Sequence, residues 1–440
     1  MSEGWARAIL TTYRWTGALA YPLIGGYVAL RVAKGKEEPA RRRERYGRAS
    51  VPRPPGPVVW VHAASVGETS AVTPLIERIS ALGIRVVLTT GTVTSARLAE
   101  ERLKGRIIHQ YVPLDLKPAV SRFLGYWNPD LAIIAESEIW PMTILELGAR
   151  RVPQVLVNGR LSDRSFAAWK RRASLAEALF ENLAHVIAQS QADAERFRAL
   201  GARPVTVSGN LKVDTQVPPA DQRSLRQLQT AIGKRGTWAA ISTHEGEEEI
   251  ACEVHESVSR KHRDLLTIIV PRHPERAQGL KAMMEARGLN VVLRTEKSPV
   301  TPDTDVFIGD TIGEMGLYLR LTEIAFVGRS LAAEGGQNPL EPAVLRTAIL
   351  SGRNVQNFRD SYQRLVKSGG AKLVRDRKML AGAVDFLLEH PTTRRGMIDA
   401  AEQTVGEMRG ALDRTMGALD PYIRPLVLKA RLVERETKRG

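Results

Sequence analysis

The stretch Val58-Val-Trp-Val-His-Ala-Ala-Ser-Val-Gly-Glu68 decides the fold class. Residues 58–61 are apolar and rich in valine, which is typical of a strand buried in a parallel sheet. A tight turn follows at 65–67, and apolar side chains at helical spacing from 72 to 79 predict a helix after it. Glu68 is therefore expected at the edge of an open α/β sheet where ligands bind. The alternative is that Glu68 only complements the positive end of the helix dipole.

The same alternation of short apolar strands and helices extends over most of the 440 residues. It predicts two doubly wound parallel sheets, over 51–215 and 236–415, because alternating strands and helices form βαβ units. A Val-Pro-Pro segment marks a hinge at 216–235. A substrate site is expected in the cleft between the two sets of strand ends. Residues 1–50 are expected to form a membrane anchor followed by a basic segment, and residues 416–440 are expected to form a basic helix.

The formal net charge of +16 predicts a negatively charged partner. An apolar run at 15–30 precedes a basic cluster of Arg31, Lys34, Lys36 and the arginines at 41–43. This order suits the cytoplasmic side of an anionic membrane, so we expect an uncleaved anchor that spans the bilayer or lies in its interface. The alternative is a buried core helix. Aromatic residues make up only 5% of the chain, so no nucleic acid is expected as a partner.

The single cysteine, Cys252, excludes an internal disulfide. No Cys/His cluster has the spacing of a zinc site. We therefore expect no metal site, and Cys252 is expected to be a small core residue of a helix.

Flexible loops follow several strands of the second half. A Gly-Asp-Thr turn leads to an expected helix start at Ile312, Gly313 and Glu314, whose backbone N–H groups suit a phosphate. A second loop runs through Gly335-Gly336-Gln337-Asn338-Pro339-Leu340-Glu341, where the Glu341 carboxylate is suited to a ribose. Together these loops predict a nucleotide site. The alternative is that they are rich in glycine for backbone reasons alone.

Two polar motifs complete the second half. Pro271-Arg272-His273-Pro274 follows a strand, and the Arg272 guanidinium matches the geometry of a phosphate. His244 either contacts substrate or lies in the capping region of an acidic helix start.

In the first half, polar side chains stand at the predicted strand ends, and Lys212 stands just before the hinge. Carboxylates at such an edge suit base catalysis of a group transfer. The strand-end residues are His62, Ser65, Glu68, Glu136, Glu138 and Asn158.

Seven motifs, in order along nearly the whole chain, resemble those of the bacterial 3-deoxy-D-manno-octulosonic acid (Kdo) transferases of lipopolysaccharide core biosynthesis. The motifs are His62-Ala-Ala-Ser-Val-Gly-Glu, Glu136-Ser-Glu-Ile-Trp-Pro, Gly209-Asn-Leu-Lys, Ser242-Thr-His-Glu-Gly-Glu-Glu, Pro271-Arg-His-Pro-Glu-Arg, Gly309-Asp-Thr-Ile-Gly-Glu and Gly336-Gln-Asn-Pro-Leu-Glu.

The resemblance implies a GT-B glycosyltransferase fold with two Rossmann-like domains, the acceptor in the first and the nucleotide sugar in the second. It implies an inverting transfer of Kdo from CMP-Kdo to a lipid A precursor (lipid IVA), without a metal or a cofactor. It also implies a location at the cytoplasmic face of the bacterial inner membrane. The alternative is a GT-B enzyme that uses a UDP-sugar.

The resemblance also implies roles for particular residues. Glu68 matches the proton acceptor, and Glu136 and Lys212 match the transition-state stabilisers. The sequence departs from the usual family pattern at Arg329, where glycine is common, and at Gln337 and Ile312. The residues that match CMP contacts are Pro271, Arg272, Ile312, Gly313, Glu314, Asn338, Pro339, Leu340 and Glu341.

Overall fold

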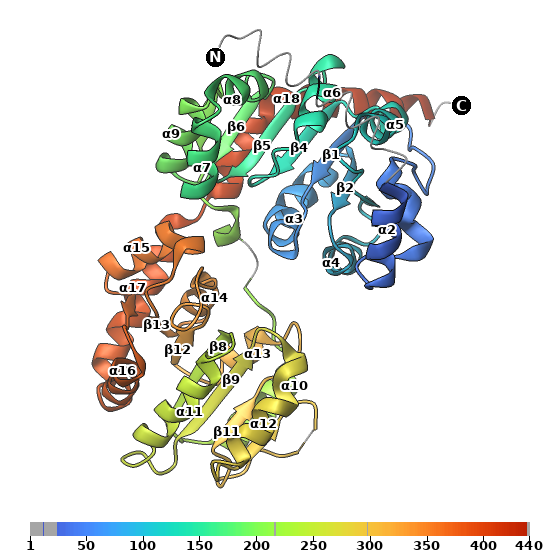
Figure 1. Cartoon of the computed structure of the whole chain (residues 1–440). Coiled ribbons are helices and arrows are strands. Elements are labelled where there is room, and N and C mark those ends of the chain that lie inside the picture. The colour runs from blue at the N-terminus through green and yellow to red at the C-terminus, as the bar shows by residue number, and fades with distance from the viewer. Residues whose placement is uncertain (1–11, 13–23, 215–216, 297, 438–440) are drawn as a thin grey trace. The chain divides into compact units, whose positions relative to one another are not determined.

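The computed structural model describes residue 12 and residues 24–214, 217–296 and 298–437. The chain forms two compact units (Figure 1). Unit 1 contains Met1–Thr215 and Arg409–Gly440, and unit 2 contains Gln216–Met408. Each unit has a seven-stranded sheet with helices packed on it. This architecture confirms the prediction of two doubly wound parallel α/β domains.

The sheet of unit 1 has the strand order β3-β2-β1-β4-β5-β6-β7. The chain adds strands on one side of β1 and then returns to add β4 on the other side, so Trp60 of β1 pairs with Val87 and with Ala132. In such sheets ligands bind at the carboxyl ends of the strands where the order reverses, here β1 and β4. The strands are β1 Val58–His62, β2 Arg85–Thr90, β3 Ile108–Tyr111, β4 Leu131–Ala135, β5 Gln154–Gly159, β6 His185–Ala188 and β7 Val205–Val207.

Helices cover both faces of this sheet. Because successive strand residues point to opposite faces, Val59 joins a core with Leu75, whereas Trp60 joins another with Phe123 and Met142. The helices are α2 Ile24–Ala33, α3 Val66–Ala81, α4 Val93–Leu103, α5 Lys117–Trp127, α6 Pro141–Ala149, α7 Asp163–Lys170, α8 Ala173–Phe180, α9 Gln191–Ala199 and α18 Ala411–Thr437, with 3-10 turns η2 Pro39–Tyr46 and η3 Leu211–Asp214.

The last helix, α18, packs on the sheet of unit 1 although its residues come at the end of the chain (Figure 1). Its Leu419, Ile423 and Leu426 are buried in the core that contains Val59. The carboxylate of Asp214 accepts the backbone N–H groups of Gly410 at 2.9 Å and Leu412 at 2.6 Å, which fixes the start of the helix. The basic helix expected at 416–440 therefore begins earlier, at Ala411, and forms part of a domain core.

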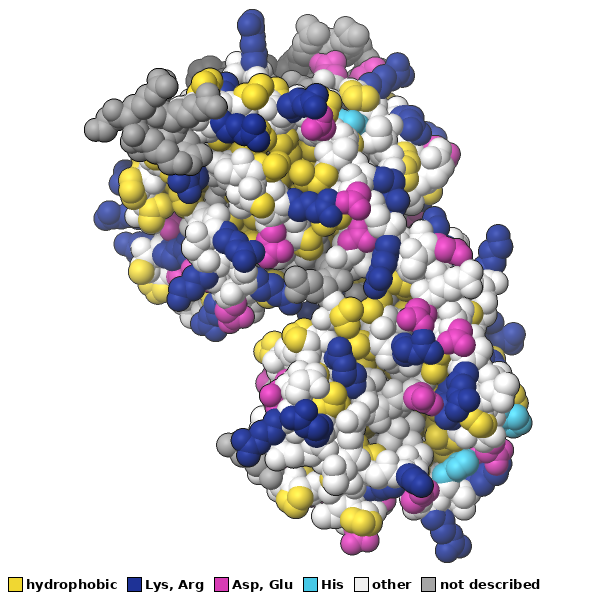
Figure 2. Space-filling model, turned by 180° about the vertical axis from the view of Figure 1, so that it is seen from behind, with side chains coloured by type: hydrophobic (Ala, Val, Ile, Leu, Met, Phe, Trp, Pro, Cys, Tyr) yellow, Lys and Arg dark blue, Asp and Glu magenta, His cyan; other side chains and the backbone are white. Residues whose placement is uncertain are grey.

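The N-terminal anchor was expected at 15–30, and residues 15–23 of that run lie outside the described residues. Within the described part of the chain, every helix is too short or too polar to cross a bilayer. Two arginines of the expected basic cluster form ion pairs inside unit 1, Arg31 with Glu37 at 2.7 Å and Arg41 with Glu44 at 3.0 Å. On the face of the molecule in Figure 2, Lys and Arg side chains are spread over both units, with Asp and Glu among them.

The sheet of unit 2 has the order β10-β11-β9-β8-β12-β13-β14, so the order reverses between β8 and β12. Ala239 of β8 pairs with Ile268 of β9 and with Ala325 of β12. The strands are β8 Thr237–Thr243, β9 Leu266–Pro271, β10 Val291–Leu293, β11 Val306–Ile308, β12 Ile324–Val327, β13 Ala348–Ser351 and β14 Ala371–Leu373.

The segment 216–235, expected as a hinge, contains the first helix of unit 2. The helices of this unit are α10 Gln222–Ile232, α11 Glu247–Val258, α12 Ala277–Glu285, α13 Met315–Leu319, α14 Leu340–Val344, α15 Arg359–Lys367, α16 Arg377–Glu389 and α17 Pro391–Met408, with 3-10 turns η4 Pro274–Arg276 and η5 Gln356–Phe358.

Candidate active site

Glu68 lies in the first turn of α3, directly after β1. Its Oε2 accepts the N–H of Ala64 at 2.8 Å, and its Oε1 accepts the hydroxyl of Ser65 at 2.8 Å. The Ser65 Oγ in turn accepts the N–H of Glu68 at 3.3 Å, a reciprocal cap that fixes the carboxylate. The two interpretations of Glu68 are thus compatible, because a carboxylate that caps the helix still has lone pairs to accept a proton.

Burial, and next the negative charges of Glu138 and Glu136, raise the pKa of Glu68 above its usual value. A carboxylate with a raised pKa is a stronger base once it is ionised. The side chain is only partly buried, so a substrate hydroxyl can approach it.

Glu136 follows β4, the strand beside β1, and has a left-handed backbone with φ +53°. Its Oε1 lies 2.6 Å from the Nζ of Lys212. The fully buried Asn158 donates its Nδ2–H to the same oxygen at 3.5 Å and accepts the N–H of Leu211 at 3.0 Å. Asn158 therefore fixes the Glu136 carboxylate and the backbone that carries Lys212.

The reversal of strand order brings these groups to one edge of unit 1. Glu68 and Glu136 follow the two strands at the reversal. The Lys212 Nζ lies next to the turn that carries Glu68, because a β-carbon added to Gly67 would be 4.0 Å from it. The edge thus holds one carboxylate with a raised pKa beside a carboxylate that is paired with an ammonium. Such a set can take a proton and stabilise a negative charge in the same place.

Glu138, two residues after Glu136, contacts Trp140 and His62 at this edge. Its Oε2 accepts the indole N–H of Trp140 at 2.7 Å and lies 3.8 Å from the His62 Nε2. Burial alone raises the pKa of Glu138, but the His62 imidazole and the Trp140 N–H outweigh it and lower that pKa. His62 is buried, and its Nδ1 contacts the Thr89 hydroxyl at 2.9 Å. Glu138 thus remains ionised and supplies the charge that raises the pKa of Glu68.

In unit 2, the loops after three neighbouring strands carry basic side chains. Arg272 follows β9, His244 follows β8 and Arg329 follows β12. The N–H of Arg272 donates to the Thr243 carbonyl at 3.0 Å, and the N–H of Gly328 donates to the Ile241 carbonyl at 2.8 Å. These bonds hold the three loops together at the carboxyl edge of the sheet, where the order of strands reverses.

Glu247 connects the loops at this edge, a role that was not predicted from the sequence. Its buried carboxylate accepts four backbone N–H groups at 2.6–3.0 Å, from His244, Arg329, Ser330 and Leu331. It therefore ties the loop after β8 to the loop after β12. No sequence pattern distinguishes Glu247 for this role, because three glutamates stand in the first turn of α11 and any of them suits a helix start.

The helix start expected at Ile312 is wrong as predicted, whereas the phosphate contact expected there stays a prediction. The helix near Ile312 begins only at Met315, because Gly313 has φ +87°, and it spans five residues. Ile312 is 90% exposed. The Glu314 carboxylate is held by Arg294 at 3.0 and 3.1 Å. Ile312, Gly313 and Glu314 thus form a turn and not a helix N-terminus.

The second expected loop keeps its short helix. Pro339 directly precedes α14, and the Asn338 Oδ1 accepts the N–H of Leu340 at 3.1 Å. The Asn338 Nδ2 lies 3.4 Å from the Glu341 Oε1, so these two side chains hold each other at the loop. The Gln337 Nε2 lies 3.2 Å from the His244 Nε2. This loop therefore contacts the loop that follows β8.

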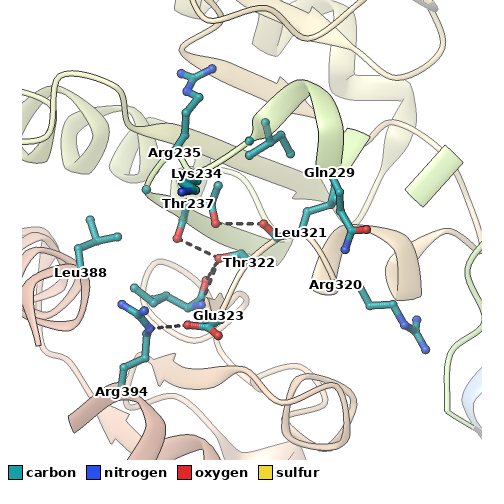
Figure 3. A pocket seen from close by; sticks show the side chains of 14 residues that line it. Gln229, Lys234, Arg235, Thr237, Arg320, Leu321, Thr322, Glu323, Leu388 and Arg394 are labelled. Carbon is teal, nitrogen blue, oxygen red and sulfur yellow. Dashed lines mark hydrogen bonds and ion pairs between the residues drawn. The ribbon is translucent and has the colours of Figure 1, made fainter. Parts of the chain in front are cut away.

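A hollow of about 460 Å³ in unit 2 lies elsewhere, at the amino ends of β8 and β12 (Figure 3). Its polar groups bond to one another: the Thr237 hydroxyl to the Leu321 carbonyl, the Thr322 hydroxyl to the Thr237 carbonyl, and Arg394 to Glu323. Because it opens at the opposite edge of the sheet, it is separate from the candidate site.

Comparisons with known proteins agree with the motifs. A family described as 3-Deoxy-D-manno-octulosonic-acid transferase (kdotransferase) matches residues 40–215. A 3-deoxy-D-manno-octulosonic acid transferase of Haemophilus influenzae is 32% identical over 414 residues, which cover 92% of this chain and 96% of that one. The enzyme of the same name from Bordetella pertussis is 34% identical over 397 residues, covering 86% and 91% of the two chains.

A solved glycosyltransferase from Rickettsia africae has the same fold, with a TM-score of 0.59, 12% identity, and coverage of 84% of this chain and 99% of that one. This likeness concerns the fold alone. Identity above 30% over most of both chains goes further and confirms the resemblance inferred from the motifs: the chain belongs to the 3-deoxy-D-manno-octulosonic acid transferase family.

Proposed function

We propose that the protein transfers Kdo from CMP-Kdo to a lipid A precursor and releases CMP. Membership of the family supports the sugar and the reaction class. The observation that carries the proposal is the meeting of Glu68 with the Lys212–Glu136 pair at one edge of unit 1. Unit 1 would bind the acceptor, and the loops of unit 2 would bind the nucleotide sugar.

Glu68 is the proposed base. It takes the proton of an acceptor hydroxyl, and the oxygen freed of that proton forms a bond to the anomeric carbon of the sugar. The bond from this carbon to the phosphate oxygen breaks, and CMP leaves from the opposite face, so the configuration inverts. The raised pKa of Glu68 suits this step, because a carboxylate that holds a proton more firmly accepts one more readily.

Lys212 and Glu136 are the proposed transition-state stabilisers. The ammonium of Lys212 offsets negative charge on the leaving CMP, and Glu136 keeps that ammonium in place at 2.6 Å. A charge that is fixed before the reaction needs no reorganisation during it. The reaction as proposed uses no metal and no cofactor.

The proposed CMP contacts lie in unit 2. The Arg272 side chain is exposed beyond the buried end of β9, where a guanidinium can meet the phosphate. Pro271 forms the end of the strand, and the turn of Ile312, Gly313 and Glu314 is proposed as a second contact. The loop of Asn338, Pro339, Leu340 and Glu341 is proposed to meet the nucleoside.

A lipid acceptor places the proposed reaction at the cytoplasmic face of the inner membrane. The net charge of +16 favours an anionic surface. Residues 1–50 are proposed to attach the protein there.

The test is incubation of the full chain with CMP-Kdo and a tetra-acylated lipid A precursor, with mass spectrometry of the lipid. We expect a mass increase of one or more Kdo units, and UDP-sugars in place of CMP-Kdo should give none. A parallel reaction with EDTA checks independence from metal. Transfer from a UDP-sugar but not from CMP-Kdo would overturn the proposal.

A further inference from the structure

We propose that Arg329 binds the carboxylate of the donor's sugar acid, beside the phosphate subsite proposed at Arg272. This inference rests on the proposed function and adds to it the group that distinguishes the sugar from the nucleotide.

The position of Arg329 within the sheet is the first support. It is the second residue after β12, and β12 and β8 are the strands between which the order of unit 2 reverses. Ligands of open α/β sheets bind at that point. Arg272 follows β9 on the other side of β8, so the two arginines flank the loop of His244.

The backbone of Arg329 is the second support. Its φ is +54°, in the left-handed region that favours glycine and that long side chains rarely adopt. Such outliers persist where the surroundings impose them, and they gather at ligand sites. Here the imposing group is the Glu247 carboxylate, which accepts the N–H of Arg329 at 2.6 Å. A long cationic side chain thus occupies a position where glycine would fit with less strain.

The Arg329 guanidinium forms a hydrogen bond to a backbone carbonyl but no ion pair with a carboxylate of the described residues. Its Nε donates to the Glu334 carbonyl at 2.9 Å, which leaves both terminal nitrogens as donors. No carboxylate of the described residues lies within ion-pair distance of it, and the side chain is exposed. Glu247, the nearby acid, is already satisfied by four N–H groups.

The surroundings include a second guanidinium, that of Arg272, and two imidazoles. Burial, and next the charge of Arg329, lower the pKa of His244; the Glu247 carboxylate opposes them, and His273 and Arg272 add smaller lowering effects. The rings of His244 and His273 lie 5.8 Å apart. Glu275 lies 3.3 Å from His273 at the outer side of the group. An anion placed here would gain favourable charge interactions with the guanidiniums of Arg329 and Arg272.

The chemistry then selects the ligand. CMP-Kdo has two anionic groups, the phosphate that remains in CMP and the carboxylate of the sugar. A guanidinium fork binds a planar carboxylate through two parallel N–H bonds. With Arg272 assigned to the phosphate, the carboxylate is the group left for Arg329.

The test compares binding of CMP-Kdo and CMP to the full chain and to Arg329→Gly. Glycine suits φ +54° and keeps the N–H that bonds to Glu247, so the variant should fold. We expect its KM for CMP-Kdo to rise roughly 10- to 100-fold, whereas its inhibition constant for CMP should change less than about 2-fold. Arg329→Lys should restore only part of the loss.

Arg346→Gly is the matched control. Arg346 also has a left-handed backbone, with φ +58°, but its guanidinium pairs with Asp399 and Glu402. This variant should keep both constants.

Equal effects of Arg329→Gly on CMP and CMP-Kdo would show a phosphate contact and overturn the inference, as would no effect on either. A wild-type chain that neither binds CMP-Kdo nor transfers its sugar would refute the proposed function, a result that is distinct from the other two.

Discussion

The Lys212 ammonium lies 2.6 Å from the Glu136 carboxylate, at an edge where a buried asparagine fixes both segments. The pair predicts that the charge of Lys212, and not its bulk, supports the reaction. Lys212→Met should lower kcat by about 100-fold, the usual effect of removing one fixed donor from a developing charge. The fold should remain, because Asn158 bonds to the backbone of Leu211 and not to the Lys212 side chain.

The measurement is kcat together with thermal unfolding. Lys281→Met is the control, since it breaks a surface ion pair with Glu296 at 2.7 Å and should change neither. An unfolded Lys212→Met chain would instead point to a structural lysine.

Glu68→Gln is expected to reduce turnover by roughly 100-fold, since glutamine cannot accept the proton. Glutamine retains an oxygen that can accept one of the bonds from Ala64 and Ser65, so α3 should still be capped. CMP affinity, measured by calorimetry, should stay unchanged because the proposed CMP contacts are in unit 2. Glu77→Gln, on the exposed side of the same helix, serves as the control. Turnover near that of the wild type would exclude Glu68 as the base.

The pH profile tests the electrostatics of the same group. The base acts when ionised, so kcat/KM should rise with pH through the raised pKa of Glu68. Because the negative charge of Glu138 contributes to that raised pKa, Glu138→Gln should shift the acidic limb of the profile to lower pH. A limb that stays in place or moves to higher pH would contradict this arrangement of charges.

Glu247→Ala addresses the scaffold of unit 2. The substitution leaves four N–H groups in a buried place without their acceptor, and each such group carries a desolvation penalty of about 1–3 kcal/mol. We expect a loss of at least about 2 kcal/mol in the free energy of unfolding, with weaker CMP binding. Denaturant titration measures the first and calorimetry the second. Glu245→Ala, at an exposed residue two positions earlier, should have neither effect, and a stable Glu247→Ala chain would show that the loops close without the carboxylate.

Local patterns were sufficient for the sheets and for part of the site. Short apolar runs predict the strands, and parallel strands place their carboxyl ends at one edge, so Glu68 and Glu136 were expected near each other. The ion pair of Glu136 with Lys212 was not predicted, because it joins segments that only the closed sheet brings together.

Other features depend on backbone geometry or long-range contacts that the sequence does not display. The left-handed Gly313 prevents the helix that was expected to start at Ile312. The ion pairs of Arg31 with Glu37 and of Arg41 with Glu44 were not predicted, because they depend on how this segment folds. Glu247 resembles its acidic neighbours until the loop after β12 is placed against it.

The position of α18 has a consequence for synthesis. The core of unit 1 includes Leu419, Ile423 and Leu426 of α18. In the sequence, all of unit 2 stands between these residues and the rest of that core. Since domains tend to fold as they leave the ribosome, the first sheet can form early, but part of one of its faces stays uncovered until α18 emerges. A chain cut short after unit 2 would therefore present that part of the apolar face to chaperones and proteases, and only chains that include α18 would have a closed first domain.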